Sequence, residues 1–239
     1  MIYLGSKSRI ANNLLLFLLS SLKKGQCYVE PFCGGCSVIQ GVPTDHRRIA
    51  NDNNRYLIAM WKALTMTGWK PPTLIEKPYY DEVRASYHAN DGKYDDATIG
   101  WVGFMASRNG RFFDGGYSGH NSGGRDYISE SIRNIKKQIP ELQGIEWQTG
   151  SYEQMTIPEE SLIYSDPPYK GTKTYSTSTH FDYPGFYDWC RTKASEGHTV
   201  FVSEYSMPPD FIPVWSKTVT VSMAPKATYH PIETLYQLK

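Results

Sequence analysis

Residues 162–169, with the sequence LIYSDPPY, constrain the fold of this chain most strongly. Their apolar part is typical of a buried strand, and the two prolines that follow it fix two φ angles and remove two backbone donors. The residue before each proline is held in an extended conformation. This stretch therefore predicts a stiff loop at the carboxyl end of a strand, with Asp166 at its start and Tyr169 at its tip.

Such a loop could bind a planar ring that carries an amino group. The carboxylate of Asp166 and the backbone carbonyl of Pro167 can each accept one proton of an NH2 group, while Tyr169 stacks on the ring. An amino-purine or an amino-pyrimidine has both features. Because Asp-Pro is also a common turn opener, an ordinary junction between a strand and a turn is the alternative for these residues alone.

A strand followed by a glycine turn is predicted near the N-terminus. Residues 27–29 (CYV) favour a strand, and residues 30–39 (EPFCGGCSVI) continue with glycines and then a predicted helix. This order is typical of the first unit of a Rossmann-like nucleotide site, in which glycines let the backbone approach the ligand. The lysine of a phosphate-binding loop is absent, and Glu30 would repel phosphate, so a ligand with hydroxyl groups or positive charge is favoured.

A further strand at residues 48–52 (RIAND) ends in an acidic residue, Asp52. Asp52 lies about 20 residues beyond the glycine turn, where Rossmann-like sites place the carboxylate that binds ribose. A helix is predicted to follow at residues 54–64, so a helix N-cap is the alternative role for Asp52. The spacing from the glycine turn favours the ribose role.

The composition narrows the class of protein. A net charge of +1 on 239 residues excludes a globally basic nucleic-acid-binding protein, so any binding of a polyanion must use a local positive surface. A hydrophobic fraction of 40% argues against disorder.

Cys33 and Cys36 form a lone C-x-x-C without the second ligand pair of a typical zinc site, which favours reduced thiols and no metal. The apolar run at residues 14–19 is too short to span a membrane and fits a buried helix.

The rest of the chain alternates helical and strand patterns, which predicts an α/β sheet. Helices are predicted at residues 10–22, 80–88, 101–105 and 128–139. Strands are predicted at residues 145–148 and 199–203, with an antiparallel pair at residues 217–223 and 234–238 closing the chain.

A glycine-rich segment from Ser107 to Arg125 is too long for a simple connector. Its arginines could bind phosphates or guanine edges, and its aromatic rings could stack on bases. A solvated surface loop is the alternative. We predict that residues 1–66 and 145–239 form a catalytic domain and that residues 67–144 are an inserted region of helices and loops for target recognition.

Four separated blocks together resemble the Dam-like family of DNA adenine methyltransferases. Residues 3–7 (YLGSK) resemble its aromatic-x-Gly-Gly-Lys motif, residues 30–37 (EPFCGGCS) its Glu-Pro-Phe-x-Gly-x-Gly-Ser loop, and residues 51–54 (NDNN) its Ala-Asp-Ile-Asn segment. The DPPY of residues 166–169 is identical to the catalytic motif of the family. The chain departs from the pattern at Ser6 and Cys36, which replace glycines, and residues 109–125 only loosely resemble the recognition hairpin of the family.

The resemblance implies a Rossmann-like, S-adenosylmethionine-dependent methyltransferase sheet with an antiparallel C-terminal strand and a small DNA-recognition lobe. It implies methylation of the exocyclic amine of adenine in double-stranded DNA, after the target base has flipped out of the duplex. The reaction does not need a metal. We expect the protein to be a monomer or a weak dimer, and to work in the cytoplasm of a bacterium or of a phage-infected cell.

The predicted site residues fall into three groups, of which the catalytic and cofactor-binding groups follow from the resemblance and the DNA-binding group follows from the arginines and aromatic residues of the glycine-rich segment. The catalytic residues are Asp166, Pro167, Pro168 and Tyr169. The cofactor-binding residues are Tyr3, Lys7, Glu30, Phe32, Gly34, Ser37, Asp52, Tyr152 and Asp166. The DNA-binding residues are Arg108, Asn109, Arg111, Tyr117 and Arg125.

Three other functions are open at this point. Methylation of the cytosine amine uses a similar site, but family members that act on cytosine usually carry serine at the position of Asp166, which favours adenine. A catalytically idle cofactor-binding module that serves as a DNA-binding accessory is a second alternative, and the intact Asp166 and Tyr169 argue against it. A methyltransferase acting on amines of RNA or protein is the third.

Overall fold

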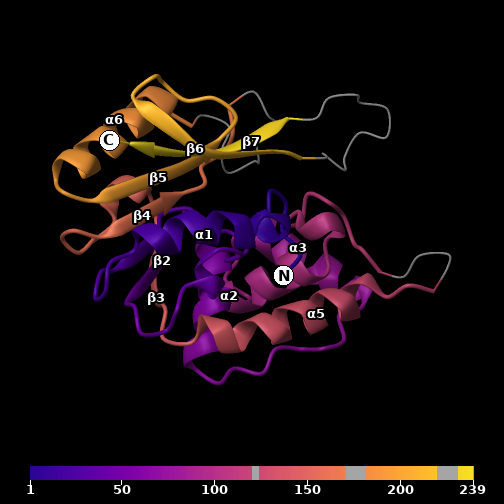
Figure 1. Ribbon diagram of the computed structural model, residues 1–239. Coiled ribbons are helices and arrows are strands. Elements are labelled where there is room, and N and C mark those ends of the chain that lie inside the picture. Colours follow the sequence, from indigo (N-terminus) through magenta and orange to yellow (C-terminus); the bar gives the residue numbers. More distant parts are fainter. Residues whose placement is uncertain (120–123, 171–180, 220–230, 239) are drawn as a thin grey trace.

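A seven-stranded sheet forms the centre of the computed structural model, which describes residues 1–119, 124–170, 181–219 and 231–238 (Figure 1). The strand order is β3-β2-β1-β4-β5-β7-β6. The strands are β1 (Tyr28–Glu30), β2 (Arg48–Asp52), β3 (Glu146–Thr149), β4 (Leu162–Ser165), β5 (Thr199–Glu204), β6 (Phe211–Thr218) and β7 (Ile232–Leu238).

The first five strands pair in parallel, and β7 runs antiparallel to both β5 and β6. The predicted α/β sheet with an antiparallel C-terminal strand is therefore confirmed. The strand order reverses between β1 and β4, and open α/β sheets bind ligands at the carboxyl ends of strands at such a point. The last two strands pair antiparallel, as predicted. The first of them, β6, was predicted at residues 217–223 but spans Phe211–Thr218, and residues 220–223 lie outside the described part.

Alternating side chains of the strands enter two separate cores, because successive residues of a strand point to opposite faces. One core contains Tyr28, Ala50, Leu162, Tyr164 and Phe201. The other contains Val29, Ile49, Ile163, Val200 and Val202. Both faces of β4 and β5 are buried, which explains why these two strands are mainly apolar in the sequence, whereas β3 at the edge is partly exposed and mainly polar.

Helices cover both faces of the sheet. They are α1 (Ala11–Ser21), α2 (Arg55–Met66), α3 (Lys77–Ala89), α4 (Asp96–Met105), α5 (Tyr127–Gln138) and α6 (Tyr183–Ser195). Buried side chains of α1 to α5 belong to the core that contains Tyr28, whereas Phe186 and Cys190 of α6 belong to the other core. Figure 1 shows α1, α2 and α5 packed together, with α6 beside the C-terminal strands. The helices predicted at residues 10–22, 54–64, 80–88, 101–105 and 128–139 are confirmed, and α6 is an additional helix, which Asp182 caps by accepting from Gly185 N.

The helix predicted directly after the glycine turn is absent, which corrects the sequence analysis. Residues Ile39–Gly41 form only a single 3-10 turn, η2, and Val42 is extended. Pro43 follows, and a proline cannot continue a helix. A Cβ at Gly41 would lie 2.3 Å from Leu15 Cδ1, so α1 packs tightly against this turn.

The insertion packs closely on the helices next to the sheet. Buried side chains of α3, α4 and α5 share one core with α1 and α2. A Cβ at Gly100 of α4 would lie 2.1 Å from the carbonyl oxygen of Tyr56 in α2, so the two helices are in backbone contact. In the described residues, no helix has the length and apolar character needed to cross a membrane.

Candidate active site

Three acidic residues lie at the carboxyl ends of neighbouring parallel strands. Glu30 ends β1, Asp52 ends β2, and Asp166 directly follows β4. This edge of the sheet contains the point where the strand order reverses, which is the usual ligand-binding edge of such folds. The structure therefore brings together acids that are far apart in the sequence, together with the glycine loop that follows β1.

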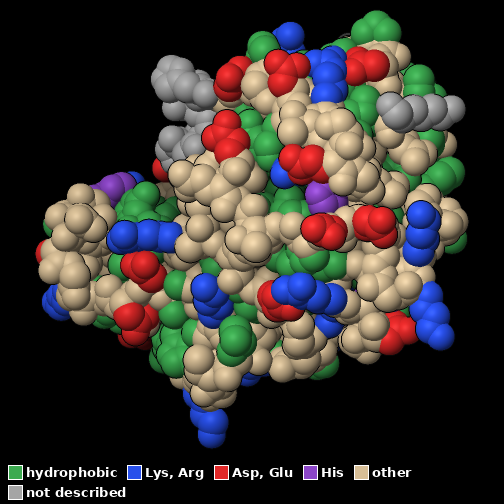
Figure 2. Space-filling model, turned by 90° about the vertical axis from the view of Figure 1, so that its left-hand side faces the viewer, with side chains coloured by type: hydrophobic (Ala, Val, Ile, Leu, Met, Phe, Trp, Pro, Cys, Tyr) green, Lys and Arg blue, Asp and Glu red, His purple; other side chains and the backbone are tan. Residues whose placement is uncertain are grey.

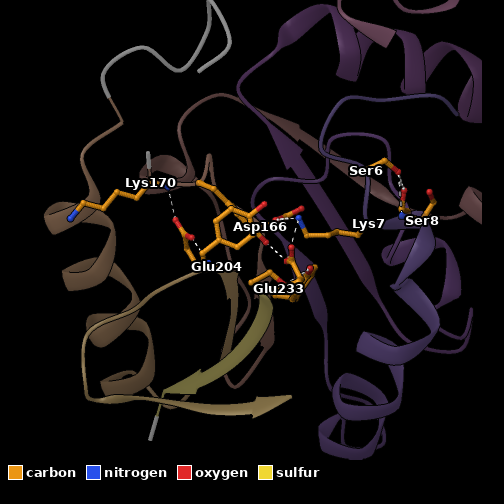
Figure 3. Close-up of polar contacts among 12 residues, drawn as sticks. Ser6, Lys7, Ser8, Asp166, Lys170, Glu204 and Glu233 are labelled. Atoms are coloured by element: carbon orange, nitrogen blue, oxygen red, sulfur yellow. Dashed lines mark hydrogen bonds and ion pairs between the residues drawn. The ribbon is translucent and has the colours of Figure 1, made fainter. Parts of the chain in front are cut away.

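Lys7 joins the N-terminal motif to the DPPY loop (Figure 3). Its Nζ lies 2.8 Å from Oδ1 of Asp166 and 3.6 Å from Oε1 of Glu233, and it sits 4.4 Å from the centre of the Tyr169 ring. The Tyr169 hydroxyl donates to Oε1 of Glu233. The ammonium thus lies between two carboxylates and the face of an aromatic ring.

The charges in this cluster perturb one another. Burial disfavours the charged form of Lys7, but Asp166 and Glu233 outweigh it, and the pKa of Lys7 is raised above its usual value. Burial raises the pKa of Asp166, and the Lys7 ammonium opposes that shift. Burial also raises the pKa of Glu30 to about 8, although its Oε1 accepts from the Tyr28 hydroxyl at 2.8 Å. Glu30 is therefore an interior acid next to the site.

Asp52 holds the glycine loop in place. Its Oδ2 accepts from Gly34 N at 3.0 Å, and its Oδ1 accepts from Asn54 N at 2.9 Å. The N-cap of α2 is Asn54, whose side chain accepts from Tyr56 N and Leu57 N. The alternative prediction, in which Asp52 is the N-cap of this helix, is therefore wrong.

Tyr3 lies directly on the glycines of the loop. A Cβ at Gly34 would lie 2.8 Å from Cε1 of Tyr3, and a Cβ at Gly35 would lie 2.9 Å from Cβ of Tyr3. Gly34 also has a φ of 45°, and Cys36 has a φ of 56°. Cys36 thus adopts the left-handed backbone that favours glycine, at the position where the family motif carries glycine.

Polar side chains tie this loop to its surroundings. Oγ of Ser37 lies 2.7 Å from Oγ of Ser6, which links the loop to the N-terminal segment. Nε2 of Gln138, the last residue of α5, donates to the carbonyl of Gly35 at 2.7 Å. Ser6 caps the short turn η1 (Lys7–Arg9), and α1 has no side-chain cap.

An aromatic cluster lies beyond the end of β1. The Phe32 ring is 5.3 Å from that of Tyr152 and 5.8 Å from that of Phe181, with Phe186 beneath at 5.7 Å. Phe32 and Tyr152, both predicted to bind the cofactor, are thus in contact. Such rings could bind the flat face of a nucleobase.

The predicted DNA-binding residues occupy two places in the insertion. Arg108, Asn109 and Arg111 are exposed on or beside the turn η3 (Arg108–Gly110), where Asn109 has a φ of 58°. This turn is docked on the N-terminal segment, because a Cβ at Gly110 would lie 2.3 Å from the carbonyl oxygen of Ile2. It therefore lies beside Tyr3, whose side chain packs on the glycine loop.

The other two residues already have partners within the insertion. The Tyr117 hydroxyl donates to the carbonyl of Ile75 at 2.8 Å, and its ring packs 5.4 Å from Tyr80. The guanidinium of Arg125 donates to both carboxylate oxygens of Glu130, at 2.9 and 2.8 Å. Residues 171–180, which follow shortly after DPPY, lie outside the described part.

Charge is mixed over the rest of the surface. Figure 2 shows acidic and basic side chains interspersed on the face that looks left in Figure 1. This face carries no large field of one sign, as the small net charge leads one to expect. All four cysteines are buried free thiols, and the described ranges contain no group of three or more metal-ligating side chains.

Sequence reasoning missed two acids and one tyrosine of the site. Glu233 lies on β7, Glu204 ends β5, and Tyr205 follows Glu204. The Tyr205 ring meets that of Tyr169 edge to face at 4.6 Å. Oε1 of Glu204 accepts from Lys170 N at 2.7 Å, and its Oε2 accepts from Tyr205 N. The only sequence signal for Glu233 was an acid inside a strand of otherwise apolar pattern.

Comparisons with known proteins identify the family of the chain. The family model described as D12 class N6 adenine-specific DNA methyltransferase matches residues 3–208. No curated protein matches the chain. Among solved structures, the crystal structure described as "SMU.472, a putative methyltransferase complexed with SAH" is similar with a TM-score of 0.40 and 12% identity. That match covers 97% of this chain and 52% of the other, so this chain spans about half the length of that protein.

Proposed function

The chain belongs to the D12 class of N6 adenine-specific DNA methyltransferases, and on this premise we propose that it methylates the exocyclic amine of adenine in double-stranded DNA. The methyl donor is S-adenosylmethionine. Such an enzyme works where the DNA is, in the cytoplasm of a bacterium or of a phage-infected cell.

One observation carries this proposal. Asp166 and Tyr169 stand on a stiff loop at the carboxyl end of β4, and Lys7 of the N-terminal motif pairs with Asp166 at 2.8 Å. A hydrogen-bond acceptor and a stacking ring are thus held next to each other beside the glycine loop. This is the arrangement that an amine on an aromatic base requires.

The neighbouring side chains fit S-adenosylmethionine. Asp52 can accept from ribose hydroxyls, the rings of Phe32 and Tyr152 can contact adenine, and the acids suit a cation and an ammonium group. The hydroxyl of Ser165 at the end of β4 is buried without a hydrogen-bond partner in the described residues. Buried polar groups are normally satisfied, so this orphaned atom also supports a polar ligand here.

The chain's own residues then perform a short series of tasks. The target adenine must leave the duplex, because its amine cannot be reached inside the stack. Asp166 and the carbonyl of Pro167 each accept a hydrogen bond from one N–H of the amine. These two hydrogen bonds draw the nitrogen lone pair out of conjugation with the ring and aim it at the methyl group. Tyr169 stacks on the base, and Lys7 holds the Asp166 carboxylate in orientation. S-adenosylmethionine supplies an electrophilic methyl group, and alignment of nucleophile and methyl accounts for much of the acceleration.

The nucleosides formed by the protein test this assignment. We expect mass spectrometry to find 6-methyladenine in double-stranded DNA incubated with the protein and S-adenosylmethionine. Cytosine N4-methylation is the nearest alternative, because its amine would be held in the same way. Methylated cytosine without methylated adenine, modified RNA or protein alone, or no transfer to any acceptor would each replace the proposal with a different function.

We further propose that residues 67–144 form the target-recognition region, with Arg108 and Arg111 as readers of bases. Both side chains are exposed, and neither has an ion pair within the described ranges. Arg125, by contrast, is bound to Glu130, and we assign it with Arg133 and Lys137 to the DNA backbone.

Removal of a base-reading arginine should relax the choice of sequence at one position. We expect Arg108→Ala or Arg111→Ala to lower discrimination there by about 1–3 kcal/mol, the range for one base contact. Single-molecule sequencing of methylated sites measures this. Arg47→Ala is the matched control, because Arg47 pairs with Glu146 at the β2–β3 edge of the sheet. Retention of the wild-type motif and rate by both variants would remove this turn as the reader.

A further inference from the structure

Glu233 lies in the site without belonging to any of the motifs. It stands on β7, 4% exposed, and it lies beyond residues 3–208, which the family model matches. Burying a carboxyl group away from water is costly, and burial raises the pKa of Glu233 above its usual value. Such a group is retained in a core only where it has partners or a task.

Tyr169 is the main partner of Glu233. The Tyr169 hydroxyl donates to Oε1 of Glu233, whereas Lys7 Nζ is 3.6 Å from that oxygen and closer, at 2.8 Å, to Asp166. Figure 3 shows Glu233 reaching the cluster from the C-terminal strand, opposite Lys7. The two residues come from chain segments that only the sheet brings together.

The backbone, the ring and the neighbours of Tyr169 are each restrained by contacts. Pro168 stiffens its backbone, Tyr205 packs against the ring edge to face at 4.6 Å, and the residue as a whole is only 8% exposed. Glu204 fixes both neighbours, because it accepts from Lys170 N and Tyr205 N. A tyrosine hydroxyl lies on the axis of the second rotatable bond, so holding it fixes the direction in which the side chain points, while the contact with Tyr205 restricts rotation of the ring about that axis.

We propose that Glu233 is a positioning residue that sets the direction of the Tyr169 side chain, and so the place of its ring, through the tyrosine hydroxyl. This role rests on the proposed function, in which the ring is the platform for the flipped base. Glu233 touches neither the amine nor the methyl group. Its effect is on the alignment of the bound base, so it acts on the chemical step more than on the binding of S-adenosylmethionine.

Four variants test this role in single-turnover and steady-state methylation of DNA. Glu233→Ala removes the acceptor, and Tyr169→Phe removes the donor while it keeps the ring. We expect each to lower kcat at least about tenfold, because small misplacements of a reactant are costly, with KM for S-adenosylmethionine within about twofold of wild type. Glu233→Gln keeps an oxygen that can accept, and we expect it to stay within about threefold of wild-type kcat. The double variant Tyr169→Phe/Glu233→Ala should be no slower than either single variant, because both remove one interaction.

The outcomes separate this role from a structural one and from the function itself. Gln237→Ala on the same strand is the control for damage to β7, and thermal unfolding checks that every variant is folded. The positioning role is overturned if the losses in kcat of the two single variants multiply in the double variant, or if Glu233→Gln is as slow as Glu233→Ala. In either case, methylation by the wild-type protein leaves the proposed function intact. A wild-type protein that methylates no base overturns the function, and the positioning role with it.

Discussion

Asp166→Ala is expected to slow methyl transfer at least about a hundredfold, while the protein stays folded. The variant loses the carboxylate that accepts one proton of the target amine, and it also frees the Lys7 ammonium that lies 2.8 Å away. Glu233, 3.6 Å from the same ammonium, remains as its counter-charge, and Asp166 lies in a loop after β4 rather than in the strand. Formation of 6-methyladenine under single-turnover conditions measures the loss.

The control for this prediction is a carboxylate outside the site. Asp210→Ala removes an acid that pairs with Arg191 at 2.7 Å on the surface, and we expect wild-type rates from it. Calorimetric binding of S-adenosylmethionine to Asp166→Ala shows whether the cofactor is still held. Wild-type formation of 6-methyladenine by Asp166→Ala would contradict the assignment of the DPPY loop as the site of chemistry.

Asp52→Ala is expected to weaken the binding of S-adenosylmethionine by about 1.5–3 kcal/mol, the range for hydrogen bonds to a charged group. That loss corresponds to roughly a ten- to hundredfold rise in Kd. Part of it would come from the glycine loop, because Gly34 N donates to Oδ2 of Asp52 and would lose its acceptor. Isothermal titration calorimetry with S-adenosylmethionine measures the affinity directly.

A capping acid in another part of the fold provides the matched comparison. Asp95 also accepts a backbone N–H, from Thr98 at 2.7 Å, but it starts α4 in the insertion. Asp95→Ala should lower stability by about 0.5–2 kcal/mol without changing cofactor affinity. If Asp52→Ala binds S-adenosylmethionine as tightly as the wild type, Asp52 acts only within the chain, on Gly34 and Asn54.

The sequence by itself determined the strands and what stands at their ends. The runs at residues 162–165 and 199–204 are mainly apolar because both faces of the sheet are buried there, and the prolines after Asp166 mark where β4 ends. Asp52 and Asp166 could be placed at strand ends because that information is local. The same reasoning failed after residue 36, where a helix was predicted and only η2 forms: Pro43 is a local signal against a longer helix, and the packing of Leu15 against Gly41 is not visible in the sequence.

Only the tertiary structure decided which side chains meet. Lys7 reaches Asp166 because the N-terminal segment crosses the carboxyl edge of the sheet, and Glu233 reaches Tyr169 because β7 inserts antiparallel between β5 and β6. The turn at Gly110 likewise rests on Ile2 by close backbone contact. Contacts of this kind join segments far apart in the chain, and a hydrophobic period reports only which face of an element is buried. The motifs could therefore identify the acceptor and the ring, while the residue that orients the ring became visible only in the folded sheet.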